Sequence, residues 1–439
     1  MKTKGNINPW WWIPTLYFAE GIPYFIVNNI SVIMFNNMGM SKGEMAWYTS
    51  LLYLPWVIKP LWSPFVDIIK TKRWWIMATQ ILMSAAFALV AFTLPHPSAE
   101  VIAGGNADVS LFAVTLVLFW ITAFASATHD IAADGFYMLA LNPGDQSLFV
   151  GIRSTFYRLS SIFGQGVLVV IAGMLERKTG NIPQAWSTTL IISAVIFAAV
   201  TLWHTFRLPR PASDSSRLEV GQGRTREIFQ EFRRTFATFF RKKHVWMAMA
   251  FMLLYRLPEA FLVKMMNPFL LDPMSEGGLG LSTETVGIVY GTVGVAALTV
   301  GGILGGFAAS RWGLKKSLWP MALSLTLPCL SFVFLAAFQP ENILLISSCV
   351  ALDQFGYGFG FTAYMLYLIY FSEGEFKTAH YSLCTAFMAL SMMLPGMVAG
   401  YLQEAVGYVW FFGFVMVCCL VTVLVTFLLK VDPQFGKKN

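Results

Sequence analysis

The chain has 439 residues, of which 56% are hydrophobic and 12% charged, and its formal net charge is +7. A water-soluble protein usually carries about 25% charged residues, so this composition excludes an ordinary soluble globule. The apolar residues fall in blocks of about twenty or more, which is enough to cross a hydrocarbon core as helices. They do not alternate with polar residues as membrane β-strands do. We therefore predict an all-α, polytopic membrane protein.

Twelve membrane spans follow one another along the chain. The first begins at Trp10 and is not followed by a small-residue cleavage site, so we expect no cleavable signal peptide. Turn-forming residues separate several of the spans, for example at 40–43, 96–98 and 142–145. The predicted spans are 10–36, 43–67, 74–94, 109–140, 147–175, 184–206, 245–271, 284–309, 317–338, 342–371, 377–405 and 407–430.

The longest polar gap divides the spans into two sets of six. We expect an N-terminal six-helix bundle over 1–207, a cytoplasmic linker over 208–244 and a C-terminal six-helix bundle over 245–439. Within the linker, Ile228, Phe232, Phe236 and Phe239 recur at helical spacing among basic residues. This pattern predicts an amphipathic helix on an anionic membrane face, and a helix that binds a partner is the alternative.

Basic residues are distributed very unevenly between the two sides of the predicted membrane. The even-numbered gaps and both termini hold 22 Lys and Arg, the other gaps hold 3, and 5 lie within spans. Cationic loops stay in the cytoplasm. We therefore expect a multi-pass protein of the cell inner membrane with both termini cytoplasmic.

A short pattern occurs in both halves, at 63–73 and at 306–316. Each copy has a small residue, a polar residue four positions later and then a basic cluster. This resembles the cytoplasmic motif of the major facilitator superfamily, a family of twelve-helix transporters. The resemblance implies that Asp67, Arg73 and Arg311 belong to a gate that holds one conformation.

The fourth span carries three ionisable residues, His129, Asp130 and Asp134. The two aspartates are four residues apart and so share one helix face. A charge inside the membrane is unfavourable by about 2.5 kcal/mol or more, and two like charges in proximity favour proton uptake by one of them. We expect a proton-coupling role, with pairing to Arg153 or Arg158 on the fifth span as the structural alternative.

The first two spans also contain charged residues. Glu20, Tyr24 and Asn28 lie on one face of the first span, where Gly21 and Pro23 weaken the helix. A broken helix can present polar groups to a solute. In the second span, Lys59 lies between two prolines and could act either in a gate or on a ligand.

The second half offers a similar set. Arg256, Glu259 and Lys264 lie in the seventh span, and the first two could simply pair with each other. In the tenth span, Tyr364 and Tyr367 have rings that could stack on a sugar, although ordinary span packing is the alternative.

The sequence gives no indication of an enzyme. Its five cysteines lack metal-ligand spacing with histidine, and we find no nucleophile elbow or phosphate loop. We expect no metal, cofactor or nucleic acid, and a monomer whose partners are a small solute, protons and membrane lipid.

Four stretches carry a closer resemblance, to the AmpG muropeptide permeases and the related acetyl-CoA transporters. The fourth-span run 127–135 is similar to the Gln-Asp-Ile-x-x-Asp run of those families, with His129 in place of Gln. The other stretches are 20–24, 54–67 and 361–382. The AmpG branch imports anhydro-muropeptides with protons, so the resemblance implies that Asp130 and Asp134 act on protons or solute.

These observations predict a proton-coupled importer of an amino-sugar or muropeptide-type solute. A transporter of another ligand, such as a coenzyme thioester, another sugar or a drug, is the first alternative, and a membrane sensor that does not transport is the second. The proton-coupling candidates are Asp130, Asp134, Glu20 and Glu259. The solute-binding candidates are Glu20, Tyr24, Asn28, His129, Arg158, Arg256, Lys264, Tyr364 and Tyr367. The gating candidates are Lys59, Asp67, Arg73 and Arg311.

Overall fold

The computed structural model of the chain describes residues 7–141, 143–212, 214, 223–374, 376–433 and 435. These residues are almost entirely helical, as the composition predicts. The elements before the linker are η1 (Pro9–Trp11), α1 (Ile13–Phe25), η2 (Ile26–Ile30), α2 (Ser31–Asn37), α3 (Lys42–Leu51), α4 (Leu54–Ile69), α5 (Lys72–Thr93), α6 (Ala99–Gly104), η3 (Val109–Phe112), α7 (Ala113–Ala140), α8 (Pro143–Ser161), η4 (Ile162–Leu168), α9 (Val169–Thr179) and α10 (Ile182–Arg207).

The linker contributes α11 (Gly223–Phe240). The second half consists of α12 (Val245–Leu254), α13 (Leu257–Leu271), η6 (Met274–Glu276), α14 (Thr283–Ile288), η7 (Val289–Gly294), α15 (Val295–Trp312), α16 (Leu314–Thr326), η8 (Leu327–Cys329), α17 (Leu330–Phe338), α18 (Ile343–Ser372) and α19 (Lys377–Leu428).

Short polar side chains begin many of these helices. The side chains of Ser41, Thr71, Asn181, Ser282 and Asn342 accept hydrogen bonds from backbone N–H groups in the first turns of α3, α5, α10, α14 and α18. Such caps satisfy donors that have no partner within the helix. Local hydrogen bonds from these capping residues therefore fix where the helices begin.

Ten helical segments are long and apolar enough to cross a membrane, and two details reconcile them with twelve spans. The last segment contains Gly407 at φ 74°, so α19 is two helices joined at a sharp bend. The second predicted span is divided into α3 and α4 by a turn at Leu52 and Tyr53, just before Pro55. The uninterrupted helix expected over 43–67 is therefore wrong, because proline cannot donate the backbone hydrogen bond needed to continue α3.

The sequence suggested a break in the first span at Pro23, but the helix does not break there. The helix continues and instead widens into a π-helical segment, η2. Similar π segments, η4 and η7, interrupt the fifth and eighth spans. Such segments displace side chains from the regular helical positions and are frequent at functional sites.

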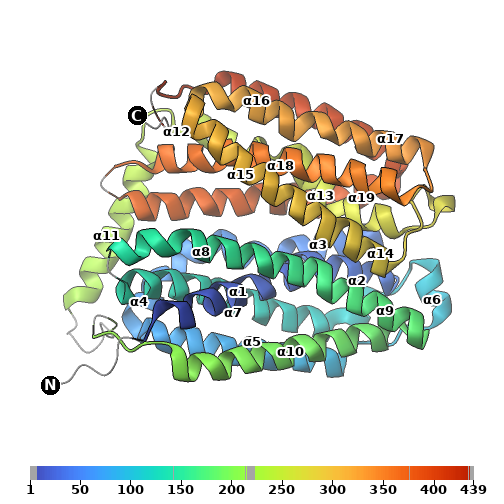
Figure 1. The fold of residues 1–439 in the computed structure, drawn as a ribbon, viewed down its shortest axis with the longest axis horizontal. Coiled ribbons are helices and arrows are strands. Elements are labelled where there is room, and N and C mark those ends of the chain that lie inside the picture. Colours follow the sequence, from blue (N-terminus) through green and yellow to red (C-terminus); the bar gives the residue numbers. More distant parts are fainter. Residues whose placement is uncertain are drawn as a thin grey trace.

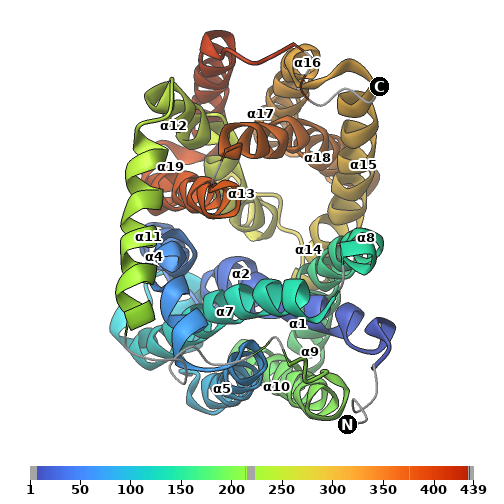
Figure 2. The same ribbon diagram turned by 90° about the vertical axis from the view of Figure 1, so that its left-hand side faces the viewer.

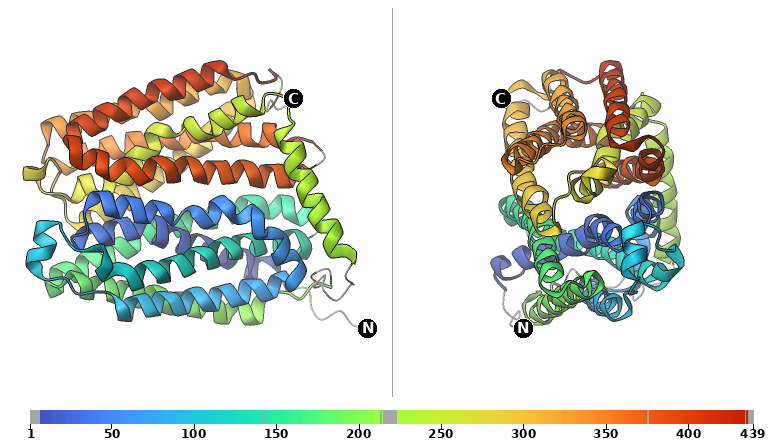
Figure 3. Two further views of the ribbon diagram at one scale, coloured as in Figure 1. Left: turned by 180° about the vertical axis from the view of Figure 1, so that it is seen from behind. Right: turned by 90° about the vertical axis from the view of Figure 1, so that its right-hand side faces the viewer.

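The helices form two groups that lie side by side (Figure 1). Elements η1 to α10 make one group and α12 to α19 the other, each around its own apolar core. Helix α11 runs across one end of both groups, almost perpendicular to the spans (Figures 2 and 3). We call this end the α11 end and the opposite one, which carries α6, the α6 end.

The apolar face of α11 packs on protein. Phe239 is fully buried against Phe371 and Phe387. The hydroxyl of Thr238 and the backbone oxygen of Thr235 lie 3.2 and 3.1 Å from His380 Nε2. A helix, α11, lies in the predicted linker, and at least part of its apolar side covers α19.

The two groups of helices are joined tightly near the α6 end. A side chain at Gly291 of η7 would place its Cβ 1.9 Å from the backbone oxygen of Gln165 in η4, and one at Gly400 would lie 1.9 Å from the oxygen of Lys42. Backbones approach this closely in membranes only where small residues allow it. Polar contacts add to the closure, including Lys42–Asp272 at 3.0 Å and Asn37 to Thr283 at 2.7 Å.

We expect Gly291→Leu to prevent closure at the α6 end, because its side chain would overlap η4. The variant should fold, because the two groups have separate cores. A thiol reagent applied from the α6 side should label Val263→Cys faster in this background than in the parent. Gly413→Leu, where a Cβ meets nothing within 4 Å, is the matched control. Unchanged labelling in the Gly291→Leu background would contradict a seal at this position.

Candidate functional site

A cavity of about 780 Å³ lies between the two groups of helices. Its wall comes from α1, α4, α7, α8 and η4 on one side and from α13, η7, α15, α18 and α19 on the other. Its ionisable lining includes Glu20, Lys59, Asp130, Arg153, Arg158, Arg256 and Glu259. Aromatic side chains fill much of the remaining wall, among them Tyr17, Tyr24, Tyr53, Trp56, Tyr157, Tyr290, Tyr357 and Phe361.

One charged cluster joins α1, α4 and α7. Lys59 Nζ lies 2.5 Å from Asp130 Oδ2. The carboxyl group of Glu20 lies close enough to that of Asp130 to interact with it, while the second oxygen of Glu20 has no partner among the described residues. A hydrogen bond between two carboxyl groups requires a proton on one of them.

A second pair lies one helical turn further along α7. Arg153 Nη2 of α8 is 2.7 Å from Asp134 Oδ1, and the Tyr17 hydroxyl donates to the same oxygen at 3.3 Å. The Arg153 guanidinium also stacks over the Tyr17 ring, 4.5 Å from its centroid. Arg153 is thus the structural partner of Asp134 that the sequence left open.

The charges of these two groups do not balance. Glu20, Asp130 and Asp134 supply three carboxyl groups, whereas Lys59 and Arg153 supply two cations. An unmatched charge is very unfavourable in a membrane interior. One proton on the Glu20–Asp130 pair would balance the cluster and would allow the two carboxyl groups to share a hydrogen bond.

The opposite wall holds a balanced ion pair. Arg256 Nε and Nη2 each lie 2.9 Å from an oxygen of Glu259, in a bidentate arrangement. The same Nη2 donates to the Tyr357 hydroxyl at 2.9 Å, and the guanidinium lies 4.7 Å from the Phe361 ring centroid. The pairing anticipated from the three-residue spacing is therefore present, on the cavity wall.

Arg158 differs from the other cations of the cavity. Its Nη1 donates to the backbone oxygen of Thr299 at 3.4 Å. Within the part of the chain that the structure describes, Arg158 forms no ion pair with a carboxylate. Its guanidinium passes over Gly302, whose missing side chain leaves space for it. This side chain can therefore receive an anionic group of a solute.

Three predicted solute-binding residues lie outside the cavity. His129 is buried behind α7, with Nε2 3.0 Å from the side-chain nitrogen of Gln80. Tyr364 is buried and donates to the backbone oxygen of Met252 at 2.7 Å, and Tyr367 packs edge-on against Phe251. These three expectations of solute contact are therefore not supported, because neighbouring helices cover the side chains.

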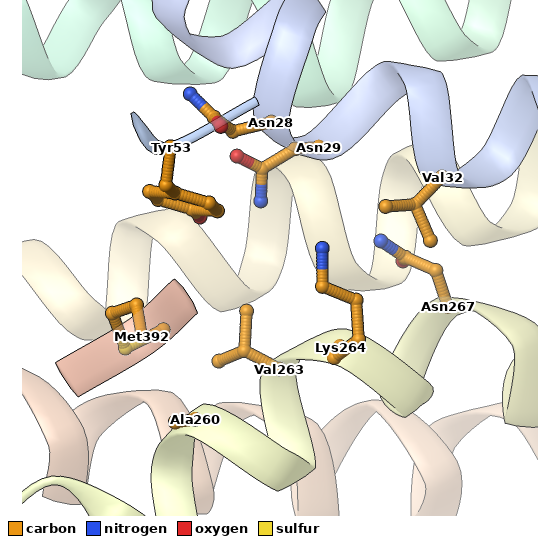
Figure 4. Close-up of a pocket in the computed structure, with 9 residues that line it drawn as sticks. All are labelled: Asn28, Asn29, Val32, Tyr53, Ala260, Val263, Lys264, Asn267 and Met392. Atoms are coloured by element: carbon orange, nitrogen blue, oxygen red, sulfur yellow. The ribbon is translucent and has the colours of Figure 1, made fainter. Parts of the chain in front are cut away.

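Asn28 and Lys264 line a small recess beside the main cavity, shown in Figure 4. Among the gating candidates, Lys59 lies on the cavity wall instead. Arg73 caps the end of α10 by donating to the backbone oxygen of Thr205 at 2.8 Å, and Arg311 is exposed at the end of α15. Asp67 falls in α4, but its side chain lies outside the described part of the structure.

Sequence reasoning missed the aromatic half of the site. Tyr17 and Trp56 were overlooked because aromatic residues are common in membrane spans. Gln165 and Tyr290 lie in η4 and η7 and line the cavity. A glycine on each side of Gln165 and the glycine after Tyr290 could have indicated irregular helix at both positions.

A sequence profile of the Major Facilitator Superfamily matches residues 15–375. The chain belongs to the major facilitator superfamily. With its membrane-spanning helices, this makes it a multi-pass membrane transporter.

Curated relatives are similar over nearly the full chain at low identity. The anhydromuropeptide permease of Escherichia coli K12 is 22% identical over 429 residues, covering 97% of this chain and 80% of the relative. The putative transporter AmpG 4 of Rickettsia felis is 24% identical over 417 residues, or 92% of each chain. An uncharacterized protein of Haemophilus influenzae is 23% identical over 436 residues, covering 96% and 94%.

Solved structures confirm the fold. A D-xylose–proton symporter superposes with a TM-score of 0.70 at 12% identity, covering 99% of this chain and 100% of the symporter. The nucleoside transporter NupG gives a TM-score of 0.67 at 16% identity, with coverage of 96% and 100%. At these identities the likeness concerns the fold alone.

A buried polar chain ties four helices of the first group together, and its centre can be tested. Gln80 bonds His129 on one side and His204 Nδ1 at 3.0 Å on the other, and His204 Nε2 lies 2.9 Å from the Thr15 hydroxyl. We expect Gln80→Leu to reduce the free energy of unfolding by about 1–3 kcal/mol, because both imidazoles lose a buried partner.

Thermal unfolding in detergent measures this effect. Thr188→Val removes a half-buried hydroxyl that donates to the backbone oxygen of Gln184 within α10. It is the control and should leave the unfolding temperature nearly unchanged. Equal stability of the Gln80→Leu and parent proteins would show that the chain of hydrogen bonds does not hold these helices.

Proposed function

We propose that the protein imports an anhydro-muropeptide or a related amino-sugar solute together with protons. Similarity to the Escherichia coli anhydromuropeptide permease supports this solute class. The cavity supports it as well. Its volume of about 780 Å³ falls within the usual 300–1,000 Å³ range of small-molecule sites, and its aromatic and charged walls match a solute with sugar rings and carboxylates.

The observation that carries the proton coupling is the excess carboxyl group at Glu20, Asp130 and Lys59. When the Glu20–Asp130 pair holds a proton, the cluster is neutral and can remain enclosed between the two groups of helices. When the proton leaves, the cluster gains an uncompensated charge, which favours contact with water. A proton moving inward supplies about 2.3 kcal/mol per 100 mV and about 1.4 kcal/mol per pH unit.

Solute recognition in this proposal centres on Arg158. It is the cavity cation without a carboxylate partner among the described residues, and a guanidinium binds carboxylates bidentately. Tyr24, Trp56 and Tyr357 offer ring faces around it. Glu259 stays paired with Arg256, so we assign it a structural role in the cavity wall and do not retain it as a proton carrier.

Alternating access follows from the way the halves meet. We propose that the bundles 1–207 and 245–439 rock about the central site. The bias of Lys and Arg supports a cytoplasmic location for the α11 end. The contacts at Gly291 and Gly400 seal the α6 end, so the described conformation is closed toward the outside of the inner membrane.

Uptake into proteoliposomes tests the solute and the coupling together. Labelled anhydro-muropeptide should accumulate when the outside is more acidic, and less so without the pH difference. Glu20→Gln should abolish accumulation but retain solute exchange at equal pH, because the amide cannot release a proton. Glu100→Gln, at an exposed position of α6, is the matched control. Full pH-driven accumulation by Glu20→Gln would reject the coupling role, and absence of muropeptide transport by the native chain would reject the solute.

Arg158→Gln should raise KM for a muropeptide with a free carboxylate about 10- to 100-fold. The lost hydrogen bonds involve charged partners, each contributing about 1.5–3 kcal/mol. The same solute with its carboxylates converted to amides should be transported equally by both proteins. Arg241→Gln, at an exposed position beyond α11, is the control. An equal rise in KM for the two solutes would contradict a specific role for Arg158.

A further inference from the structure

A narrow recess extends from the main cavity toward the α6 end. Its volume is about 10 Å³, and it shares Asn29, Tyr53, Val263 and Met392 with the cavity. Its wall comes from both groups of helices. In Figure 4, Lys264 from α13 and Asn29 from the first span extend toward each other across it.

Lys264 places a buried amine in this recess. The side chain is 5% exposed, and its Nζ donates to the Thr49 hydroxyl at 3.0 Å. The Thr49 hydroxyl in turn donates to the backbone oxygen of Met45. The described residues place no carboxylate in an ion pair with Lys264. An ammonium group has three donors, so Lys264 can donate to a further acceptor.

Two amide oxygens in the same recess need donors. The Asn28 side-chain nitrogen donates to the backbone oxygen of Tyr24 at 3.1 Å, which fixes the orientation of its amide. Oδ1 of Asn28 and Oδ1 of Asn267 are buried and have no partner among the described residues, and each side chain is 2% exposed. A buried acceptor without a donor is unfavourable by about 1–3 kcal/mol.

We propose that the recess binds a secondary amide group of the solute. The amide oxygen accepts from Lys264, and the amide N–H donates to Asn28 or Asn267. A carboxylate would satisfy Lys264 but leave both asparagine oxygens without donors, and an amine would repel Lys264. A secondary amide has the required acceptor and donor on adjacent atoms.

In the described conformation the recess is too small for an amide group of a solute, so it must widen before such a group can enter. A volume of about 10 Å³ is what one water needs, and a water can accept from Lys264 and donate to the asparagines in the same way as an amide. Because both groups of helices line the recess, it widens when they separate at the α6 end. This inference deepens the proposed function. It rests on that function for the claim that the amide-bearing solute is transported, whereas the claim that the recess binds an amide stands on the recess alone.

Protection of a cysteine from a thiol reagent tests the recess without transport. Val263→Cys places the thiol where the recess joins the cavity, and labelling is measured above that of the native cysteines. N-methylacetamide is the amide probe, and methyl acetate, which lacks the N–H, is the comparison. N-methylacetamide should slow labelling, and methyl acetate should need about a tenfold higher concentration, as expected for one hydrogen bond.

Removing either the asparagine acceptors or the lysine donor should remove the preference for N-methylacetamide over methyl acetate. In the Val263→Cys background, Asn267→Leu and Asn28→Leu each delete an acceptor, and Lys264→Met deletes the donor. We expect the half-protecting concentration of N-methylacetamide to rise about tenfold in at least one asparagine variant and in Lys264→Met. Asn106→Leu, at an exposed loop position, is the control. If one asparagine variant does not fold, the other still tests the proposal.

The outcomes separate this inference from the proposed function. Equal protection by the ester and the amide, or unchanged protection in all three variants, overturns the amide site even if muropeptides are transported. Amide-specific protection in a protein that moves no muropeptide overturns the proposed solute alone. Protection by N-acetylglucosamine but not by alanylalanine identifies an acylated sugar amine as the source of the amide, and the reverse identifies a peptide bond.

Discussion

Pairing of opposite charges organises the walls of the cavity, and Arg158 is the lining cation left without a carboxylate among the described residues. Arg256 and Glu259 neutralise each other on one cavity wall, and Arg153 neutralises Asp134 on the other. The remaining cluster has Glu20 and Asp130 for the single cation Lys59. A proton is the smallest group that can correct this excess, and its arrival or departure changes whether the cavity is better closed or hydrated. In the mechanism that we propose, coupling and conformational change thus have one electrostatic origin.

The fold could be predicted because membrane spans depend on two strong signals. Each span needs a continuous apolar block, and the turns between blocks contain residues with distinctive backbone chemistry, such as Gly407 and the capping Asn342. What the sequence could not provide was the local irregularity of the spans. The π segments at η2, η4 and η7 depend on how neighbouring backbones pack, and the turn between α3 and α4 replaced an expected continuous helix.

The candidate site was predicted where charge was the guide and missed where orientation mattered. Glu20, Asp130 and Arg256 were found because an intramembrane charge is unfavourable without a purpose. His129 and Tyr364 were assigned to the solute from residue type alone, but the structure turns them toward neighbouring helices, where they bond Gln80 and Met252. Lys264 shows a third case, because its hydrogen-bond partner Thr49 and the recess residue Asn28 come from distant segments that only the fold brings together.

Infrared difference spectroscopy of the purified protein tests the shared proton most directly. A protonated carboxyl group absorbs at a different frequency from a carboxylate, so the native chain near neutral pH should show a carboxylic acid band that is lost in Glu20→Gln or Asp130→Asn and kept in Glu100→Gln. The band should also disappear when the pH is raised far enough to remove the proton. A native spectrum without any band that depends on Glu20 or Asp130 would show that both groups are ionised, which would contradict the account.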